Sequence, residues 1–228
     1  MQNNHEVLKQ FIGGLSKGYN NSLIVLGSAG IGKSETTMRA LSALGYKEGI
    51  NYIYLNNYIT PVELYNKLQL ANKLQEPKLV IMDDSEETLK NYKAVGLLKG
   101  ALWAVDGKRK VSWVSGTSKI KVQEFIFNGR IIFLLNEMNS KSTLVKALQD
   151  RSLFFEIKFS KDELCQMIRE RAKQNYQGID FNKRLEIANY LIKVAGNSDK
   201  LSLRLLPKAF QLWQVSRNHW TELVDHII

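Results

Sequence analysis

The hydrophobic positions of this chain alternate between short, nearly continuous apolar runs and longer stretches with helical spacing. Four runs are typical of parallel strands that are covered on both faces, and they span Ser22–Leu26, Tyr52–Leu55, Lys78–Met82 and Arg130–Leu135. Amphipathic or helix-compatible stretches accompany them, the first two over Glu6–Gly18 and Glu35–Leu44. Strands that alternate with helices predict an α/β sandwich built on a parallel sheet.

The pattern changes after Phe159, where the strand signal ends. Helical spacing then covers Lys161–Asn175, Asn182–Ala195 and Leu201–Val215. We therefore expect an α/β domain over residues 1–159 and a small helical domain over residues 160–228.

A segment with a period of two lies between the third and fourth predicted strands. Residues Lys110–Ser115 and Lys119–Phe127 alternate between apolar and polar, and the turn residues Gly116, Thr117 and Ser118 separate them. This arrangement predicts a β-hairpin with a three-residue loop, over about residues 108–128.

The predicted hairpin is rich in positive charge. Its basic residues are Lys108, Arg109, Lys110, Lys119 and Lys121. Only Asp106 and Glu124 oppose them, and the whole chain has a formal net charge of +10. Such a protein usually has a polyanionic partner, either nucleic acid or an anionic membrane surface. The basic side chains would follow the phosphates of a nucleic acid, with Trp113 as a stacking surface. The alternative is a solvated basic face with Trp113 buried against the sheet.

Composition excludes several other classes of protein. The 228 residues, 44% of them hydrophobic, suffice for one or two domains with a sizeable core. No apolar stretch approaches the roughly 20 residues of a membrane span, and Met1–Gln10 is too polar for a signal peptide. We therefore expect an intracellular, cytoplasmic protein, in the host cytoplasm if it is viral, without membrane association. Cys165 is the only cysteine, and His5, His219 and His226 lack metal-ligand spacing, so we expect neither an internal disulfide nor a Cys/His metal site.

The most specific motif follows the first predicted strand. Residues Gly27–Ser34 read GSAGIGKS, and a helix-compatible run begins directly after them. Glycines let the main chain wrap closely around a polyphosphate, with N–H groups and a helix N-terminus directed at the anion. Lys33 would reach the β- and γ-phosphates of ATP, and the Ser34 hydroxyl would ligate Mg²⁺. The expected nucleotide-binding residues are Gly27, Ser28, Ala29, Gly30, Ile31, Gly32, Lys33, Ser34 and Glu35.

Acidic and amide residues end the next two apolar strands. Asp83 and Asp84 follow the third strand, and Asn136 follows the fourth. Asp83 is in the position of a magnesium ligand, and Asp84 is in the position of a general base that orients water. The alternative for the acidic pair is a helix cap. Asn136 would hold the attacking water or contact the γ-phosphate.

These motifs together resemble the AAA+ ATPase family over nearly the whole chain. GSAGIGKS is similar to Walker A, LVIMDD to Walker B and FLLNE to the sensor 1 strand. ALQDRS is similar to the segment that carries the arginine finger, which implies that Arg151 acts on a neighbouring subunit's nucleotide. LSLRLLPKA is similar to the sensor 2 helix of the lid domain, which implies that Arg204 contacts the nucleotide. Many family members have Asp-Glu where this chain has Asp-Asp, so Glu86 is a second candidate for the general base.

The predicted hairpin resembles the one that precedes sensor 1 in DNA-translocating AAA+ rings and in superfamily 3 viral helicases, which also carry Asp-Asp. The resemblance implies a P-loop NTPase fold of AAA+ type with a helical lid, and Mg²⁺-dependent ATP hydrolysis in a homo-oligomer, either a hexameric ring or a helical assembly. The implied role is a DNA motor or helicase in the replication of a virus or mobile element, with replication proteins as further partners. Two alternatives remain open: a helicase loader, initiator or transposition-type ATPase that assembles on DNA without translocation, and a protein-remodelling ATPase.

Overall fold

The computed structural model describes residues 4–113, 123–136, 143–196 and 198–228. Contacts between residues divide the chain into two compact units. The first unit comprises Met1–Ser28 and Lys33–Ile157, and the second comprises Ala29–Gly32 and Lys158–Ile228. In the part of the chain that the structure describes, no helix is both long and apolar enough to cross a membrane.

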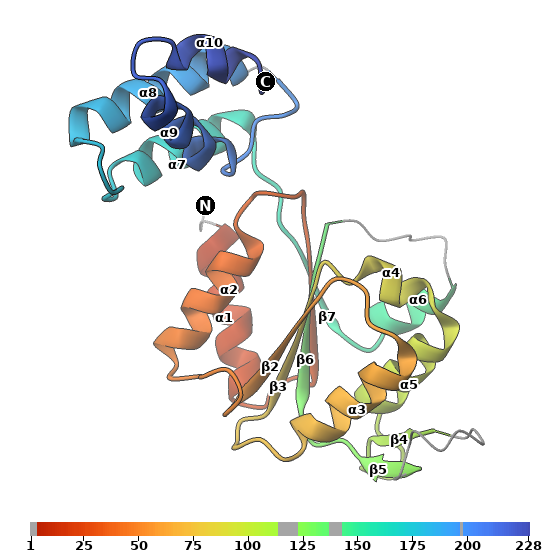
Figure 1. The fold of residues 1–228 in the computed structure, drawn as a ribbon. Helices are drawn as coiled ribbons and strands as arrows, with labels where there is room; N and C mark the ends of the chain where they lie inside the picture. Colours follow the sequence, from red (N-terminus) through yellow and green to blue (C-terminus); the bar gives the residue numbers. More distant parts are fainter. Residues whose placement is uncertain (1–3, 114–122, 137–142, 197) are drawn as a thin grey trace. The chain divides into compact units, whose positions relative to one another are not determined.

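The first unit is built on a five-stranded parallel sheet with the order β2-β3-β6-β1-β7 (Figure 1). Its strands are β1 (Ser22–Leu26), β2 (Tyr52–Asn56), β3 (Leu79–Asp83), β6 (Arg130–Leu135) and β7 (Leu153–Glu156). The central strands β1, β3 and β6 are buried almost throughout, as expected for strands that have helices on both faces. Because all five strands run in the same direction, their carboxyl ends lie at the same edge of the sheet.

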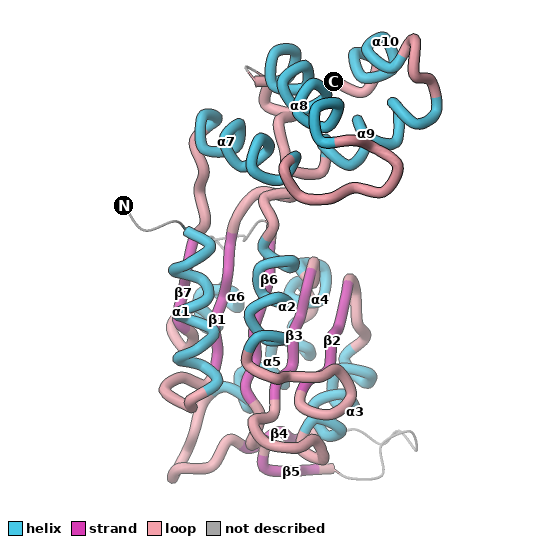
Figure 2. Tube along the Cα trace, turned by 90° about the vertical axis from the view of Figure 1, so that its left-hand side faces the viewer, coloured by secondary structure: helices cyan, strands magenta, loops and turns pink. Residues whose placement is uncertain are grey.

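Helices cover the two faces of this sheet. The helices of the first unit are α1 (Asn4–Ser16), α2 (Lys33–Ala43), α3 (Pro61–Ala71), α4 (Glu86–Lys90), α5 (Tyr92–Leu102) and α6 (Thr143–Gln149). Figure 2 shows α1 and α2 in front of the sheet, and Figure 1 shows α3 to α6 on the opposite face. The start of α3 follows from its local sequence, because the Thr60 hydroxyl accepts a hydrogen bond from Glu63 N–H (3.3 Å) and Pro61 occupies the first turn.

The main hydrophobic cluster lies between the sheet and helices α3 and α5. Leu64, Leu68 and Leu98 from the helices pack with Val80 and Phe133 from the strands, and all five are fully buried. Burial of each such side chain stabilises the fold by about 1.5–3 kcal/mol. Because neighbouring strand residues point to opposite faces, Asp83 faces the α1 and α2 side, whereas Met82 joins this cluster.

A two-stranded antiparallel ribbon precedes β6. It consists of β4 (Lys110–Ser112) and β5 (Glu124–Ile126), with Val111 opposite Phe125. The predicted three-residue loop at 116–118 lies outside the described residues. Val111 is fully buried, and Trp113 and Phe125 both pack edge-on against Tyr65 of α3, with ring centroids 6.0 and 5.2 Å away. The base of the ribbon is therefore part of the core, and Trp113 is half-buried in it.

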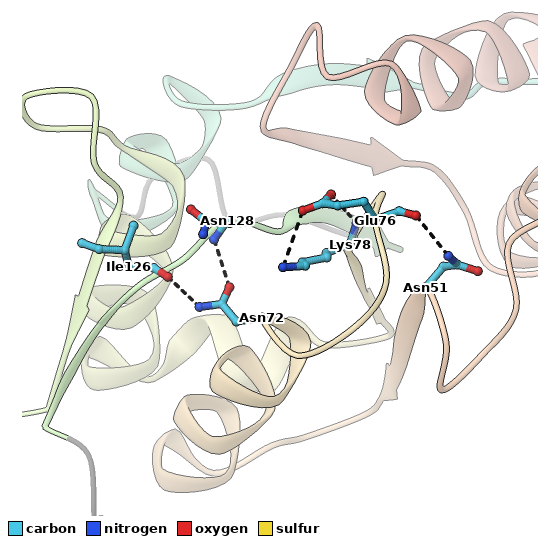
Figure 3. A network of polar contacts seen from close by, with 6 residues as sticks. All are labelled: Asn51, Asn72, Glu76, Lys78, Ile126 and Asn128. Carbon is cyan, nitrogen blue, oxygen red and sulfur yellow. Dashed lines mark hydrogen bonds and ion pairs between the residues drawn. The ribbon is translucent and has the colours of Figure 1, made fainter.

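Asn72 attaches this ribbon to the end of α3 (Figure 3). Its Nδ2 donates to the Ile126 carbonyl at 2.5 Å, and its Oδ1 accepts from Asn128 N–H at 3.0 Å. One side-chain amide thus pairs with the main chain on both sides of Phe127, as a neighbouring strand would. Nearby, Lys78 forms an ion pair with Glu76 at 3.5 Å.

The second unit contains four helices among its described residues. They are α7 (Lys161–Ala172), α8 (Phe181–Ala195), α9 (Leu205–Val215) and α10 (Trp220–Asp225). Ser160 and Glu163 form a complete capping box at the start of α7. The buried Arg184 donates to the Ala172 and Ile179 carbonyls at 3.0 and 2.5 Å, which ties α8 to the end of α7.

Several features differ from the sequence-based expectation, and helices α4, α5 and α6 were not assigned to residues from the sequence. The sheet has a fifth strand, β7, which the hydrophobic pattern did not indicate because this four-residue edge strand leaves Phe154 41% exposed. Helix α10 was not predicted. Helix α9 begins at Leu205 rather than at Leu201. Pro207 lacks an N–H and is tolerated in the first turn of a helix, which favours a start just before it.

Candidate functional site

The GSAGIGKS segment forms the connection between β1 and α2. Gly30 and Gly32 have φ values of +78° and +88°, which favour glycine. The loop begins beside β6, because Gly27 N–H donates to the Leu135 carbonyl at 3.1 Å. Of the remaining loop residues, Ser28 and Ala29 are exposed and Ile31 is buried. Exposed loop atoms leading into a helix N-terminus form the arrangement that binds phosphates.

Lys33 is buried within this loop. Its Nζ donates to the carbonyls of Gly27 at 2.6 Å and Ser28 at 3.0 Å, and to Asn136 Oδ1 at 2.9 Å. A desolvated ammonium group requires such acceptors. The sequence predicted Lys33 and Asn136 as separate site residues, and the structure brings them into direct contact.

Asn136 connects Lys33 to two carboxylates. Its Nδ2 donates to Asp84 Oδ1 at 2.6 Å, and its main-chain N–H donates to Glu86 Oε1 at 2.6 Å. Asp84 has a φ of +48°, a left-handed conformation that Asp and Asn adopt more readily than most residues. Both candidates for the general base therefore accept a hydrogen bond from Asn136. Glu86 also holds the main chain at the end of β6.

Asp83 is buried on the α2 side of the sheet. Its Oδ2 accepts a hydrogen bond from Tyr54 Oη at 2.5 Å, and its Oδ1 has no hydrogen-bond partner among the described residues. Burial raises the pKa of the Tyr54 phenol, and so does the hydrogen bond to Asp83. Tyr54 therefore remains a protonated donor at neutral pH. The sequence motifs did not predict Tyr54 as a site residue, because only the pairing of β2 with β3 places it beside Asp83.

These residues meet at the carboxyl edge of three adjacent strands. Gly27 follows β1, Asp83 ends β3 and Asn136 follows β6, and the sheet order places β6 between the other two. Among the described residues, the site contains the carboxylates of Asp83, Asp84 and Glu86 and the ammonium group of Lys33. An anionic polyphosphate would be repelled there without a cation.

The residues present fit a magnesium ion. Asp83 Oδ1, which is buried and has no hydrogen-bond partner within the described ranges, and the Ser34 hydroxyl in the first turn of α2 are hard oxygen donors. Mg²⁺ is usually bound by one or two such groups together with substrate phosphates. Glu35, also in this first turn, forms an ion pair with Arg39 at 2.7 Å.

Arg151 lies at the other edge of the sheet. Its carbonyl accepts from the Ser22 hydroxyl at 3.2 Å, and Ser22 begins β1 whereas Gly27 follows its end. The guanidinium donates to the Ala147 carbonyl at 2.6 Å and lies 5.3 Å from the Trp103 ring centroid. The structure therefore does not bring Arg151 to Lys33.

Arg204 lies at the start of α9, in the second unit, which also contains the P-loop residues Ala29–Gly32. Leu203 N–H donates to the Gly30 carbonyl at 3.0 Å. A Cβ atom at Gly30 would lie 3.3 Å from Arg204 Cγ and 3.0 Å from Ser202 Cβ. The structure thus places the exposed Arg204 beside the tip of the P-loop.

The basic residues of the ribbon do not form one surface. The Arg109 guanidinium donates to the carbonyls of Ala101 at 3.2 Å and Gly129 at 2.7 Å. Burial, and secondarily the charge of Arg130, lower the pKa of Arg109 to about 10. Lys110 forms an ion pair with Glu124 at 2.8 Å, whereas Lys108 is exposed. Lys119 and Lys121 lie outside the described residues.

Comparison with known proteins adds a relative and two similar structures. No protein-family model matches the chain. A protein of Enterobacteria phage T4, described as an uncharacterized 36.7 kDa protein of the nrdC–mobD intergenic region, is 29% identical over 163 residues. The match covers 66% of this chain and 49% of the phage protein, so the chain spans about half the length of that relative.

The solved structures resemble this chain in fold. A chain of the Escherichia coli MS115-1 HORMA:CdnC:Trip13 complex has a TM-score of 0.57 at 12% identity, covering 97% of this chain and 86% of that one. A DNA replication initiation factor has a TM-score of 0.53 at 15% identity, covering 92% of this chain and 59% of that one. The fold is of the AAA+ type. The predicted fold class, a P-loop α/β sandwich with a parallel sheet followed by a small helical domain, is confirmed.

Proposed function

We propose that this protein is a Mg²⁺-dependent ATPase that assembles with copies of itself and acts on DNA in the replication of a phage or mobile element. The observation that carries the ATPase proposal is the contact of Asn136 with Lys33, Asp84 and Glu86 at the end of β6. The P-loop lysine and two candidate bases are thereby joined by one residue, through its side-chain amide and its main-chain N–H, at the edge where the P-loop begins.

The roles of the side chains follow from their chemistry. Lys33 would balance phosphate charge, and Asn136 would orient the γ-phosphate or the attacking water. Asp84 would orient that water and accept its proton, with Glu86 as the second candidate. Magnesium, held by Ser34 and Asp83, would neutralise the charge on the phosphates. Arg204, beside Gly30, would add a guanidinium to the same nucleotide.

The position of Arg151 supports assembly into an oligomer. Residue 151 lies at the amino edge of the sheet, one strand length from its own P-loop, so any nucleotide that it contacts belongs to another copy. An arginine supplied in trans stabilises the charge of the phosphoryl-transfer transition state. We therefore propose Arg151 as the group that makes hydrolysis depend on assembly.

The positive charge of the chain and its similarity to two known proteins support action on DNA. The chain carries a net charge of +10, and Lys108, Lys119 and Lys121 remain as candidate phosphate contacts. One structural neighbour is a DNA replication initiation factor, and the relative in sequence is a phage protein. This likeness favours an initiator or loader that assembles on DNA over a translocating helicase.

The test measures ATP binding and hydrolysis with and without single- and double-stranded DNA, alongside molecular mass. Wild type should bind ATP, hydrolyse it with Mg²⁺ and form larger assemblies on ATP and DNA. Lys33→Ala should lose binding, whereas the exposed lysine control Lys47→Ala should behave as wild type. Asp84→Asn should bind ATP without hydrolysing it, because Asn tolerates the same positive φ and preserves the shape of the side chain. Failure of the wild type to bind ATP would refute the proposal.

A protein-directed ATPase is the second candidate. Tyr58 follows β2 and is 53% exposed, and one structural neighbour comes from a complex with other proteins. ATPase activity that is unaffected by DNA, in an assembly that does not bind DNA, would favour this candidate. An initiator would instead bind DNA in the presence of ATP without separating its strands, and a helicase would separate them.

A further inference from the structure

We propose that Tyr54 is a positioning residue for the magnesium ion: its hydroxyl holds the Asp83 carboxylate so that Oδ1 is available to the metal or to a metal-bound water. This inference rests on the function proposed above and extends it to a residue outside the nucleotide-binding motifs. The observation is the asymmetric environment of Asp83, in which Oδ2 accepts from Tyr54 and Oδ1 has no partner among the described residues.

The sheet determines this contact. β2 and β3 pair with Tyr54 opposite Ile81 and Asn56 opposite Asp83. Residues two apart on a strand share a face, so the Tyr54 side chain lies on the same face as Asp83 and reaches it diagonally. α2, whose first turn contains Ser34, covers this face (Figure 2). Tyr54, Asp83 and Ser34 therefore lie on one side of the sheet.

A buried carboxylate with one free oxygen requires an explanation. Asp83 is 3% exposed, and an unpaired carboxylate oxygen in such a position is unfavourable unless a ligand, water or ion satisfies it. Tyr54 satisfies one oxygen and prevents the carboxylate from rotating, so the free oxygen keeps a fixed direction. Groups that orient a metal ligand in this way typically change metal affinity or activity by about 10- to 100-fold when they are removed.

The test compares Tyr54→Phe with Tyr52→Phe. The control also loses a phenol from β2, two residues earlier on the same face, where the diagonal neighbour corresponding to Asp83 is Ile81. Mn²⁺ binding in the presence of ADP, followed by electron paramagnetic resonance, reports the metal site without turnover. Binding of a fluorescent ADP analogue in EDTA reports the nucleotide site without metal.

We expect Tyr54→Phe to weaken Mn²⁺ binding about 10-fold or more, and to raise the Mg²⁺ concentration for half-maximal ATPase similarly. Nucleotide affinity in EDTA should stay at the wild-type value, and Tyr52→Phe should match wild type in all three measurements. Equal Mn²⁺ affinity in Tyr54→Phe and wild type would overturn the inference, as would equal losses of affinity with and without metal. If Tyr54→Phe does not fold, Tyr54→Met provides the same comparison.

A double-mutant cycle tests whether Tyr54 acts through Asp83. In an Asp83→Ala background, Tyr54→Phe should not weaken Mn²⁺ binding further, because the carboxylate that it positions is absent. Additive losses would overturn the inference. A wild-type protein that binds no nucleotide would refute the proposed function itself, whereas wild-type binding with an unaffected Tyr54→Phe variant would refute only the role of Tyr54.

Discussion

Replacement of Arg109 by methionine separates a structural role from a DNA-binding role at this position. The guanidinium donates to the Ala101 carbonyl at the end of α5 and to the Gly129 carbonyl just before β6, and it lies 5.4 Å from the Phe127 ring centroid. Methionine preserves most of the apolar contact with Phe127 but removes the charge and both hydrogen bonds. We therefore expect Arg109→Met to destabilise the first unit rather than to weaken DNA binding.

The lost hydrogen bonds determine how much Arg109→Met should lower the free energy of unfolding. A hydrogen bond from a charged group is worth about 1.5–3 kcal/mol, and carbonyls left without a donor add a desolvation penalty when water cannot reach them. Arg109 is only partly buried, so water replaces some of the lost bonds. The free energy of unfolding should fall by about 2–4 kcal/mol, which corresponds to about 4–16 °C in melting temperature for a unit of this size.

The assay is urea denaturation followed by circular dichroism, with Lys108→Met as the matched control. Lys108 is the exposed neighbour of Arg109, so its replacement should change the free energy of unfolding by less than about 0.5 kcal/mol. DNA affinity is measured at several salt concentrations, well below the melting temperature of both variants. The structural role is refuted if Arg109→Met is as stable as Lys108→Met, and a lower salt slope in that variant would identify Arg109 as a DNA contact.

Two further predictions concern Arg151 and the basic residues of the predicted hairpin. Arg151→Ala should reduce ATP turnover by about 10³- to 10⁵-fold. Mixing this variant with Asp84→Asn protein should restore part of the activity. No restored activity, in a protein that stays monomeric in ATP, would contradict action in trans. Replacing Lys108, Lys119 and Lys121 by alanine should reduce the log–log salt slope of DNA binding by about 2 for single strands and about 2.7 for duplex. Basal ATPase should not change, and an unchanged slope would show that these lysines form only a solvated surface.

The fold could be predicted where local sequence carries the information. The four predicted apolar runs each lie within a residue or two of an observed strand, because strands that helices cover on both faces are largely hydrophobic. β7 is an edge strand of alternating burial, and four residues are too few to establish a period. Helix α9 starts late because Pro207 restricts it, whereas hydrophobic spacing alone extends to Leu201.

The candidate site could be predicted only in part. A motif reveals Lys33 at the start of α2 and Asp83 and Asn136 at strand ends, and parallel strands bring their carboxyl ends together. The contact of Lys33 with Asn136 and that of Tyr54 with Asp83 depend on which strands are neighbours in the sheet. A tyrosine in the middle of an apolar strand has no local feature that distinguishes it from a core residue.

Charge patterns were the least informative part of the sequence. Arg109 and Lys108 are adjacent, and both were expected to contact DNA phosphates. Arg109 instead donates to two main-chain carbonyls, whereas Lys108 is exposed. Lys110 is partly neutralised by Glu124, whose pKa is lowered by hydrogen bonds from Lys110 and Ser112. Arg109 differs from Lys108 because its side chain reaches a carbonyl of α5, and a count of basic residues cannot show this contact.

The order of elements around β6 limits what the ribbon can do. Residues before a parallel strand lie at its amino edge and residues after it at its carboxyl edge, so the ribbon and Asn136 are separated by the six residues of β6, about 20 Å. Side chains at the base of the ribbon are therefore too far from the P-loop of the same chain to contact a nucleotide bound there. Arg151 lies at the same amino edge, beside the start of β1. If mutation of exposed residues at this edge lowers the proposed ATPase activity, the cause is then a change in folding, in DNA binding or in another subunit. Measurements of stability, of the salt dependence of DNA binding and of activity in mixtures of variants distinguish these three causes.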